Sequence, residues 1–197
     1  MVLFAVLVGA ALARTEKLER FLMPMLVSIW LMGLMTIVLY VTMRINGRLP
    51  GVRSWLWGYV FGLIFCVGFL LRPHMPEWLA VLVAQSTVLL TGYFNLSACK
   101  AYLDLPPPKH RYAITGILCV IALSMYYTSI QPQSEARFVT GSLGTAVLYL
   151  LSARTMAQGD LQQFPARRVF VWICGAHGAF LMLRPLLFKL GRDGLFD

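Results

Sequence analysis

The sequence is short of charged residues. Only 13% of its 197 residues are charged, and Asp and Glu together number 8, whereas globular proteins carry about 25% charged residues. It also lacks the HExxH, GxSxG and Walker A signatures and has no paired acids within an apolar run. The longest gap between apolar runs, residues 155–168, is too short to fold as a domain. We therefore expect no soluble catalytic module, no enzymatic activity and no cofactor in this chain.

Cysteine is also scarce, and its spacing carries no metal signature. The four cysteines stand at Cys66, Cys99, Cys119 and Cys174, without a CxxC pair. All four fall in or at the ends of apolar runs, where a free thiol behaves as a small apolar side chain. This pattern argues against a disulfide framework and against a metal site.

Long apolar runs are what the sequence does contain. Hydrophobic residues make up 59% of the chain, and a helix needs about 20 apolar residues to cross about 30 Å of hydrocarbon. Six runs approach that length: 21–43, 55–71, 78–102, 112–130, 138–153 and 169–187. We predict an all-α polytopic transmembrane bundle with six full spans, placed in the bacterial inner membrane. The predicted domain is 21–190, between an N-terminal apolar segment 1–20 and a short extracytoplasmic tail 191–197.

The basic residues alternate between loops. The net charge is +9, but it is dispersed and forms no single stripe, which argues against nucleic acid as a partner. Three loops carry three Lys or Arg each, whereas 72–77 and 131–137 carry one Arg each beside a Glu. By the positive-inside rule the rich loops are cytoplasmic; they are 44–53, 100–111 and 154–168.

The first apolar segment is too short to span a membrane alone. Residues 2–13 are apolar over about twelve positions and end in Ala11-Leu12-Ala13, which is typical of a signal-peptide cleavage site. No basic residue precedes Arg14. Three interpretations stay open: an unusual signal segment, a partial helix against the bundle, or an interfacial anchor.

Two pairs of segments hint at an internal repeat. Thr-Ile-Val-Leu-Tyr at 36–40 is echoed by Thr-Ala-Val-Leu-Tyr at 145–149, and the Leu-Leu-Arg-Pro ending at Pro73 by Met-Leu-Arg-Pro ending at Pro185. The nearly equal offset predicts parallel three-helix repeats linked by 112–130, with a seventh helix after Asp197. Chance similarity among apolar segments is the alternative.

Ionisable groups inside spans are costly and are functional candidates by default. His177 falls near the middle of the last span, and Arg184 lies two turns further on the same face. Arg72 ends the second span at the same outer side. These arginines could bind an anionic amphiphile or lipid by bidentate hydrogen bonds, with Gln85 as a further polar candidate. The alternatives are that His177 fixes packing by a hydrogen bond and that each arginine reaches out to lipid phosphate.

Small residues predict where helices approach closely. Gly58 and Gly62 form a GxxxG pair, and Gly175 and Gly178 flank His177. In the third span a polar and small stripe recurs at near-helical spacing; it consists of Gln85, Gly92, Asn95 and Cys99. The stripe either bonds to a neighbouring helix or lines a cavity with the last span.

The stretch 51–103 resembles the N-terminal membrane region of bacterial diguanylate cyclases. It carries a Trp-x-x-Gly helix start at Trp55–Gly58, the helix end Gly-Phe-Leu-Leu-Arg at 68–72 where the family has Leu-x-x-Arg, a Pro-x-Trp-Leu start at Pro76–Leu79, and Gly92 in the following helix. The likeness extends over about residues 21–187, and Gln85 stands where the family often has Asn. No Gly-Gly-Asp-Glu-Phe motif occurs, so the cyclase activity is not carried over. The resemblance implies an input module joined through one more helix to a cytoplasmic output domain.

We therefore expect a membrane-embedded sensory module that responds to an amphiphile, a lipid or the state of the membrane. Its partners are the bilayer, an anionic ligand and a second copy of the chain, the last because cyclase output domains must pair. A small transporter built from three-helix repeats is the main alternative. A scaffold that recruits partners through basic residues such as Arg44, Arg48 and Arg167 is another.

Reporter fusions test the orientation. Fusions at Lys109 and at Arg167 should be active with a reporter that works only in the cytoplasm, because both lie in basic loops. A fusion at His74 serves as the control and should be active only with a periplasmic reporter. Exposure of Lys109 or Arg167 to the periplasm would overturn the orientation.

Overall fold

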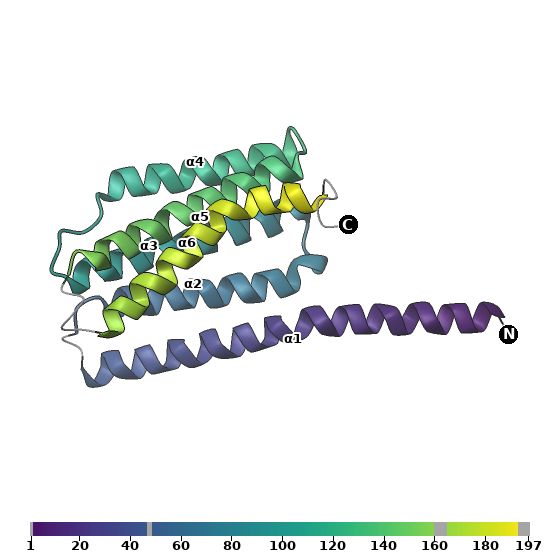
Figure 1. The fold of residues 1–197 in the computed structure, drawn as a ribbon, viewed down its shortest axis with the longest axis horizontal. Coiled ribbons are helices and arrows are strands. Elements are labelled where there is room, and N and C mark those ends of the chain that lie inside the picture. Colours follow the sequence, from purple (N-terminus) through teal and green to yellow (C-terminus); the bar gives the residue numbers. More distant parts are fainter. Residues whose placement is uncertain (1, 47–48, 160–164, 193–197) are drawn as a thin grey trace.

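In a computed structural model of the protein, every described element is helical (Figure 1). The structure describes residues 2–46, 49–159 and 165–192. Arg48 and the tail residues 193–197 lie outside the described residues. The elements are α1 (Val2–Ile45), α2 (Val52–Leu71), a short 3₁₀ helix η1 (Arg72–His74), α3 (Glu77–Tyr102), α4 (His110–Ser129), α5 (Ser134–Ala157) and α6 (Pro165–Arg192).

The predicted all-α fold is confirmed, and six of its helices are long and apolar enough to cross a membrane. Each candidate span falls within a few residues of its predicted range at both ends. Large apolar side chains point outward: Trp30 is 76% exposed and Trp172 is 72% exposed. Such a surface suits hydrocarbon and not water. The chain has the features of a multi-pass membrane protein.

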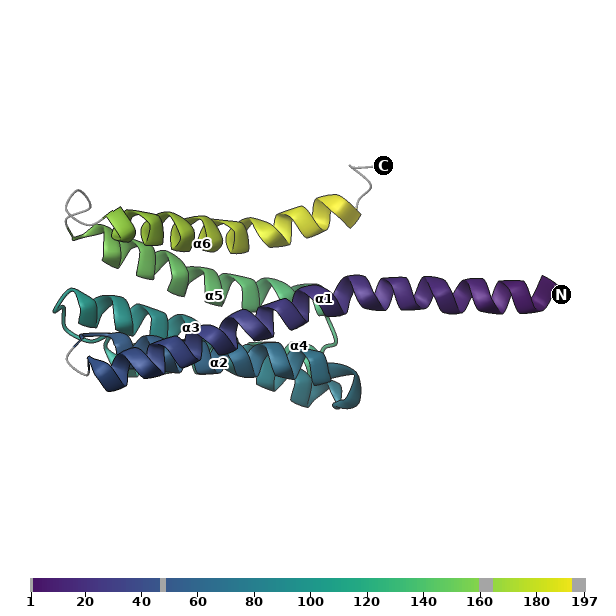
Figure 2. The ribbon, with the colours of Figure 1, turned by 90° about the horizontal axis from the view of Figure 1, so that it is seen from below.

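The N-terminal apolar segment and the first span form one helix. α1 runs without a break from Val2 to Ile45 over 44 residues, or about 66 Å at 1.5 Å per residue. Its C-terminal half packs along α2, and its N-terminal half extends beyond the other helices (Figures 1 and 2). The helix therefore continues through the boundary that the sequence suggested near residue 20.

The centre of the bundle is the pair α3 and α5. α3 packs against α2, α4 and α5, while α5 packs against α3, α4 and α6. Their buried residues are mostly small, and they include Ala98, Cys99, Ala146 and Ser152. Small side chains let helix backbones approach closely, which is how packing is gained between helices in lipid.

Helix pairs at equivalent positions of the suggested repeat can be compared. α1 packs on α2 as α5 packs on α6, and α2 then packs on α3. The parallel three-helix repeat stays a prediction.

Glycines on α2 and α3 lie where neighbouring helices approach closely. A methyl group on Gly58 would lie 3.5 Å from the Thr91 carbonyl oxygen of α3, and one on Gly62 would lie 3.4 Å from the Met32 sulfur of α1. One on Gly92 would lie 3.0 Å from Leu148 Cβ of α5. The GxxxG pair thus packs inside the bundle, between α1, α2 and α3.

The two glycines beside His177 differ in their surroundings. A methyl group on Gly178 would lie 2.8 Å from Leu150 Cγ and 3.2 Å from the Leu150 backbone nitrogen, whereas one on Gly175 would meet only Ala153 Cβ, at 3.9 Å. Gly178 therefore marks the close approach of α6 to α5, and Gly175 lies at ordinary contact distance.

This difference predicts opposite outcomes for two substitutions one turn apart. Gly178→Ala should lower the free energy of unfolding by about 1–3 kcal/mol, because overpacking forces the helices apart. Gly175→Ala should leave it unchanged or raise it by up to about 1 kcal/mol, the gain in helix propensity. Unfolding of both variants in detergent micelles measures the effect. Equal stability of the two variants would contradict the close approach at Gly178.

Candidate ligand-binding site

A cavity of about 560 Å³ opens between α2, α3, α5 and α6, near the end where α2 turns into η1. We call it the arginine cavity, because Arg72, Arg137 and Arg184 line it together with Gln85 and His177. Its volume falls within the range of about 300–1,000 Å³ that is typical of small-molecule sites. The four ligand-binding candidates from the sequence, Arg72, Gln85, His177 and Arg184, all line this one cavity.

The three arginines reach the cavity from three helices. Arg72 follows the last turn of α2, Arg137 lies in the first turns of α5, and Arg184 lies on α6. Arg137 donates from Nη1 to Glu77 Oε1 at 2.7 Å and to Thr128 Oγ1 at 3.4 Å. Within the described chain, neither Arg72 nor Arg184 forms a salt bridge. The charge of Arg137 is thus balanced by a carboxylate, whereas Arg72 and Arg184 form no such ion pair with a described residue.

Aromatic rings hold the other two guanidiniums. Arg184 Cζ lies 4.4 Å from the centroid of the Phe138 ring, and Arg72 Cζ lies 5.9 Å from that of Phe69. A ring face attracts a cation without occupying its N–H donors in the guanidinium plane. Both arginines can therefore still bind a carboxylate or phosphate.

Gln85 brings an amide into the deeper part of the cavity. It lies on α3, and its Oε1 is buried without a hydrogen-bond partner among the described residues. The amide fits there because Gly141 of α5 faces it: a methyl group at that position would overlap the Gln85 side chain. A buried carbonyl oxygen without a donor is costly, at about 1–3 kcal/mol. A ligand hydroxyl or a water molecule could supply the missing donor.

His177 lies on the α6 side of the same cavity. Its ring meets the Tyr149 ring of α5 edge to face, with 4.7 Å between the centroids. Both residues line the cavity, as does Leu181 one turn further along α6. His177 and Arg184, seven residues apart, thus face the same space, as their spacing predicted.

The rest of the α3 stripe is used for packing. Asn95 Oδ1 accepts a hydrogen bond from Trp55 Nε1 at 3.2 Å, and Asn95 Nδ2 donates to Cys174 Sγ at 3.8 Å. Gly92 faces Leu148, and Cys99 is fully buried. Of the four stripe residues, only Gln85 lines the arginine cavity. Cys66, Cys99 and Cys174 are buried free thiols, while Cys119 on α4 is exposed.

Sequence reasoning missed Arg137 as a site residue. The sequence places Arg137 in the loop 131–137, beside Glu135. In the structure it lies in α5, and only 16% of its side chain is exposed. A signal was present in the sequence. Small and polar residues recur at helical spacing along this span and would have indicated a polar face; they are Ser134, Arg137, Gly141, Thr145 and Tyr149.

Comparison of the chain with protein-family models, with curated proteins and with solved structures finds no match. Among the described residues, no group of three or more His, Cys, Asp or Glu side chains could hold a metal ion. The site must therefore be interpreted from its own geometry.

The two amides of α3 provide a matched test of the site. Gln85→Leu should raise the free energy of unfolding of the ligand-free protein by about 1–3 kcal/mol, because it removes a buried oxygen without a partner. Asn95→Leu should lower it by a similar amount, because it leaves the Trp55 N–H without an acceptor. Thermal unfolding in detergent without added lipid measures both. Destabilisation by both substitutions would show that Gln85 is satisfied as Asn95 is.

Proposed function

We propose that the chain is a membrane-embedded signal-input module whose ligand is an anionic amphiphile bound in the arginine cavity. The observation that carries this proposal is the pair Arg72 and Arg184, two guanidiniums that form no salt bridge with a described residue and that line a cavity with both polar and apolar walls. Its apolar walls include Phe65, Val88 and Leu181. A ligand with a negatively charged head and a hydrocarbon tail satisfies both parts.

The position of the cavity favours such a ligand over a free ion. It begins at the ends of α2 and α6, where head groups meet water, and it reaches inward to Gln85 and Tyr149. A head group at the arginines gains charge-assisted hydrogen bonds. A tail along the apolar walls leaves lipid for a surface of similar polarity, so the head group supplies most of the selectivity.

Ligand binding could change the arrangement of the helices. Arg72 belongs to α2 and Arg184 to α6, and these two helices are not among the extensively packed pairs of the bundle. A head group that binds both arginines would draw the outer ends of α2 and α6 together. A ligand can shift such an equilibrium only by its differential affinity for the two states, and simultaneous contact with both arginines supplies that difference.

The resemblance to diguanylate cyclase membrane regions supports the sensory interpretation over transport. In that interpretation the change passes to a cytoplasmic output domain, and the chain itself catalyses nothing. A second cavity lies toward the opposite end of the bundle, and it shares no lining residue with the arginine cavity. This separation favours a pocket with a closed inner end over a continuous polar path.

Binding of dodecyl phosphate tests the proposal. The affinity of the purified protein for dodecyl phosphate should fall by about tenfold or more in Arg72→Gln and in Arg184→Gln, because each loses charge-assisted hydrogen bonds. Titration below the critical micelle concentration of the ligand, with the protein in a nonionic detergent, measures the affinity. Arg53→Gln, an exposed arginine at the opposite end of α2, is the matched control and should bind as the wild type does.

Dodecanol provides the control for the head group and should bind much more weakly than dodecyl phosphate. Spin labels at the exposed residues Leu71 and Leu187 should move closer on addition of dodecyl phosphate in the wild type but not in Arg72→Gln. Equal affinity for dodecanol would rule out recognition of an anion. Accumulation of the ligand in sealed proteoliposomes would favour the transporter instead.

A further inference from the structure

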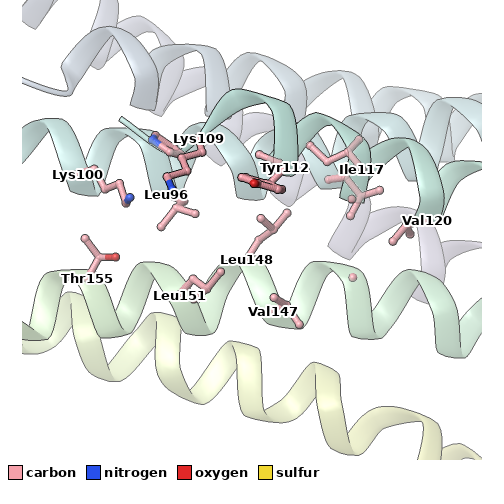
Figure 3. A pocket seen from close by; sticks show the side chains of 15 residues that line it. Leu96, Lys100, Lys109, Tyr112, Ile117, Val120, Val147, Leu148, Leu151 and Thr155 are labelled. Carbon is pink, nitrogen blue, oxygen red and sulfur yellow. The ribbon is translucent and has the colours of Figure 1, made fainter. Parts of the chain in front are cut away.

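A second cavity of about 510 Å³ lies between α3, α4 and α5, toward the opposite end of the bundle from the arginine cavity (Figure 3). We call it the lysine cavity, because Lys100 and Lys109 line it. Figure 3 shows both ammonium groups at the end where Thr155 lies, with Ile117 and Val120 at the other end. The remaining walls are chiefly aliphatic side chains and glycines.

The two lysines are brought together by the turn between α3 and α4. Lys100 lies in the last turn of α3, and Lys109 is the residue that caps the start of α4. The connection contains Pro106, Pro107 and Pro108, which cannot continue a helix and so fix a corner. Neither lysine forms a salt bridge with a described residue. Two positively charged side chains therefore line one end of the cavity, and neither is held in a salt bridge with a described residue.

The cavity is elongated. It runs along 89–100 of α3, 109–120 of α4 and 144–155 of α5, a length of about 16 Å at 1.5 Å per residue. This length and a volume of about 510 Å³ accommodate an extended hydrocarbon chain.

The cavity includes unfilled space beside Gly116 of α4. A methyl group added to Gly116 would meet no atom within 4 Å, although Gly116 lines the cavity. Ser124, in the second half of α4, is the buried residue of this helix. An apolar occupant suits the aliphatic walls between α4 and α5, because water there would lack hydrogen-bond partners.

We propose that the lysine cavity is a binding site for an anionic glycerophospholipid of the adjacent leaflet. The phosphate lies against the ammonium groups of Lys100 and Lys109, and one acyl chain lies between α4 and α5 toward Val120. Positive charge at head-group depth selects an anionic over a zwitterionic lipid, and the elongated apolar cavity selects a lipid over a soluble phosphate. The bound lipid fixes α4 to the α3–α5 pair.

Lipid retention in native mass spectrometry tests this site. The full chain is purified in detergent and mixed with phosphatidylglycerol or with phosphatidylethanolamine of the same acyl chains. Retention of phosphatidylglycerol should be about tenfold or more above that of phosphatidylethanolamine, and the double variant Lys100→Gln with Lys109→Gln should abolish this preference. The matched control neutralises Arg53 and Arg168, which are exposed near the same end and do not line the cavity. It should keep the preference.

A second pair of variants tests the apolar part of the lysine cavity. Gly116→Leu fills the open space and should reduce phosphatidylglycerol retention several-fold, while Gly33→Leu, at a glycine of α1 that also has no atom within 4 Å of an added methyl group, should not. If Gly116→Leu does not fold, Ala113→Leu fills the same cavity one turn earlier. Soluble glycerol phosphate in excess should not displace the lipid.

Three results with the variants would overturn the site. They are an equal loss of preference in the Arg53 and Arg168 control, unchanged retention in the lysine double variant, and unchanged retention when the cavity is filled. Displacement by glycerol phosphate would instead assign the lysines to a soluble phosphate and would equally refute the lipid. None of these results depends on dodecyl phosphate binding at the arginine cavity, so the two proposals fail separately.

Discussion

The close approach of α3 and α5 is the constraint on which the rest of the bundle depends. Hydrocarbon solvates an apolar helix as well as another helix does, so contact must come from backbones that fit closely. Across this interface Leu148 packs against Gly92, and Gln85 packs against Gly141. Once these two helices are joined, α2 and α4 have α3 to pack on, and α4 and α6 have α5.

The same constraint explains where the cavities lie. Small residues of α5 line both cavities: Gly141 and Ser142 line the arginine cavity, and Gly144 lines the lysine cavity, so side chains that permit close packing also leave space unfilled. The arginine cavity lies between α2, α3, α5 and α6, and the lysine cavity lies between α3, α4 and α5. Each has cationic side chains near one end of the bundle and apolar side chains further along its walls. Both cavities therefore match the chemistry of amphiphiles.

The sequence predicted the spans and much of the arginine cavity for a physical reason. An ionisable or amide group is costly within an apolar run, so His177, Arg184 and Gln85 were conspicuous without any structure. Arg137, Lys100 and Lys109 were not, because each stands near a span end, where a charge has an ordinary role in orientation. Their use depends on which helices are neighbours, and hydropathy alone does not determine that α3 lies against α5.

α5 provides a physical route between the two cavities. Gly141, Thr145 and Tyr149 of α5 line the arginine cavity, and Gly144, Leu148, Leu151 and Thr155 line the lysine cavity, so both cavities border the middle of this helix. A helix is stiff over this distance, so a tilt that narrows one cavity must move the wall of the other. A lipid that fixes α4 against α5 therefore opposes such a tilt. In the proposed input module, ligand affinity at one cavity would by linkage depend on occupancy of the other, and the composition of the membrane would become part of the signal.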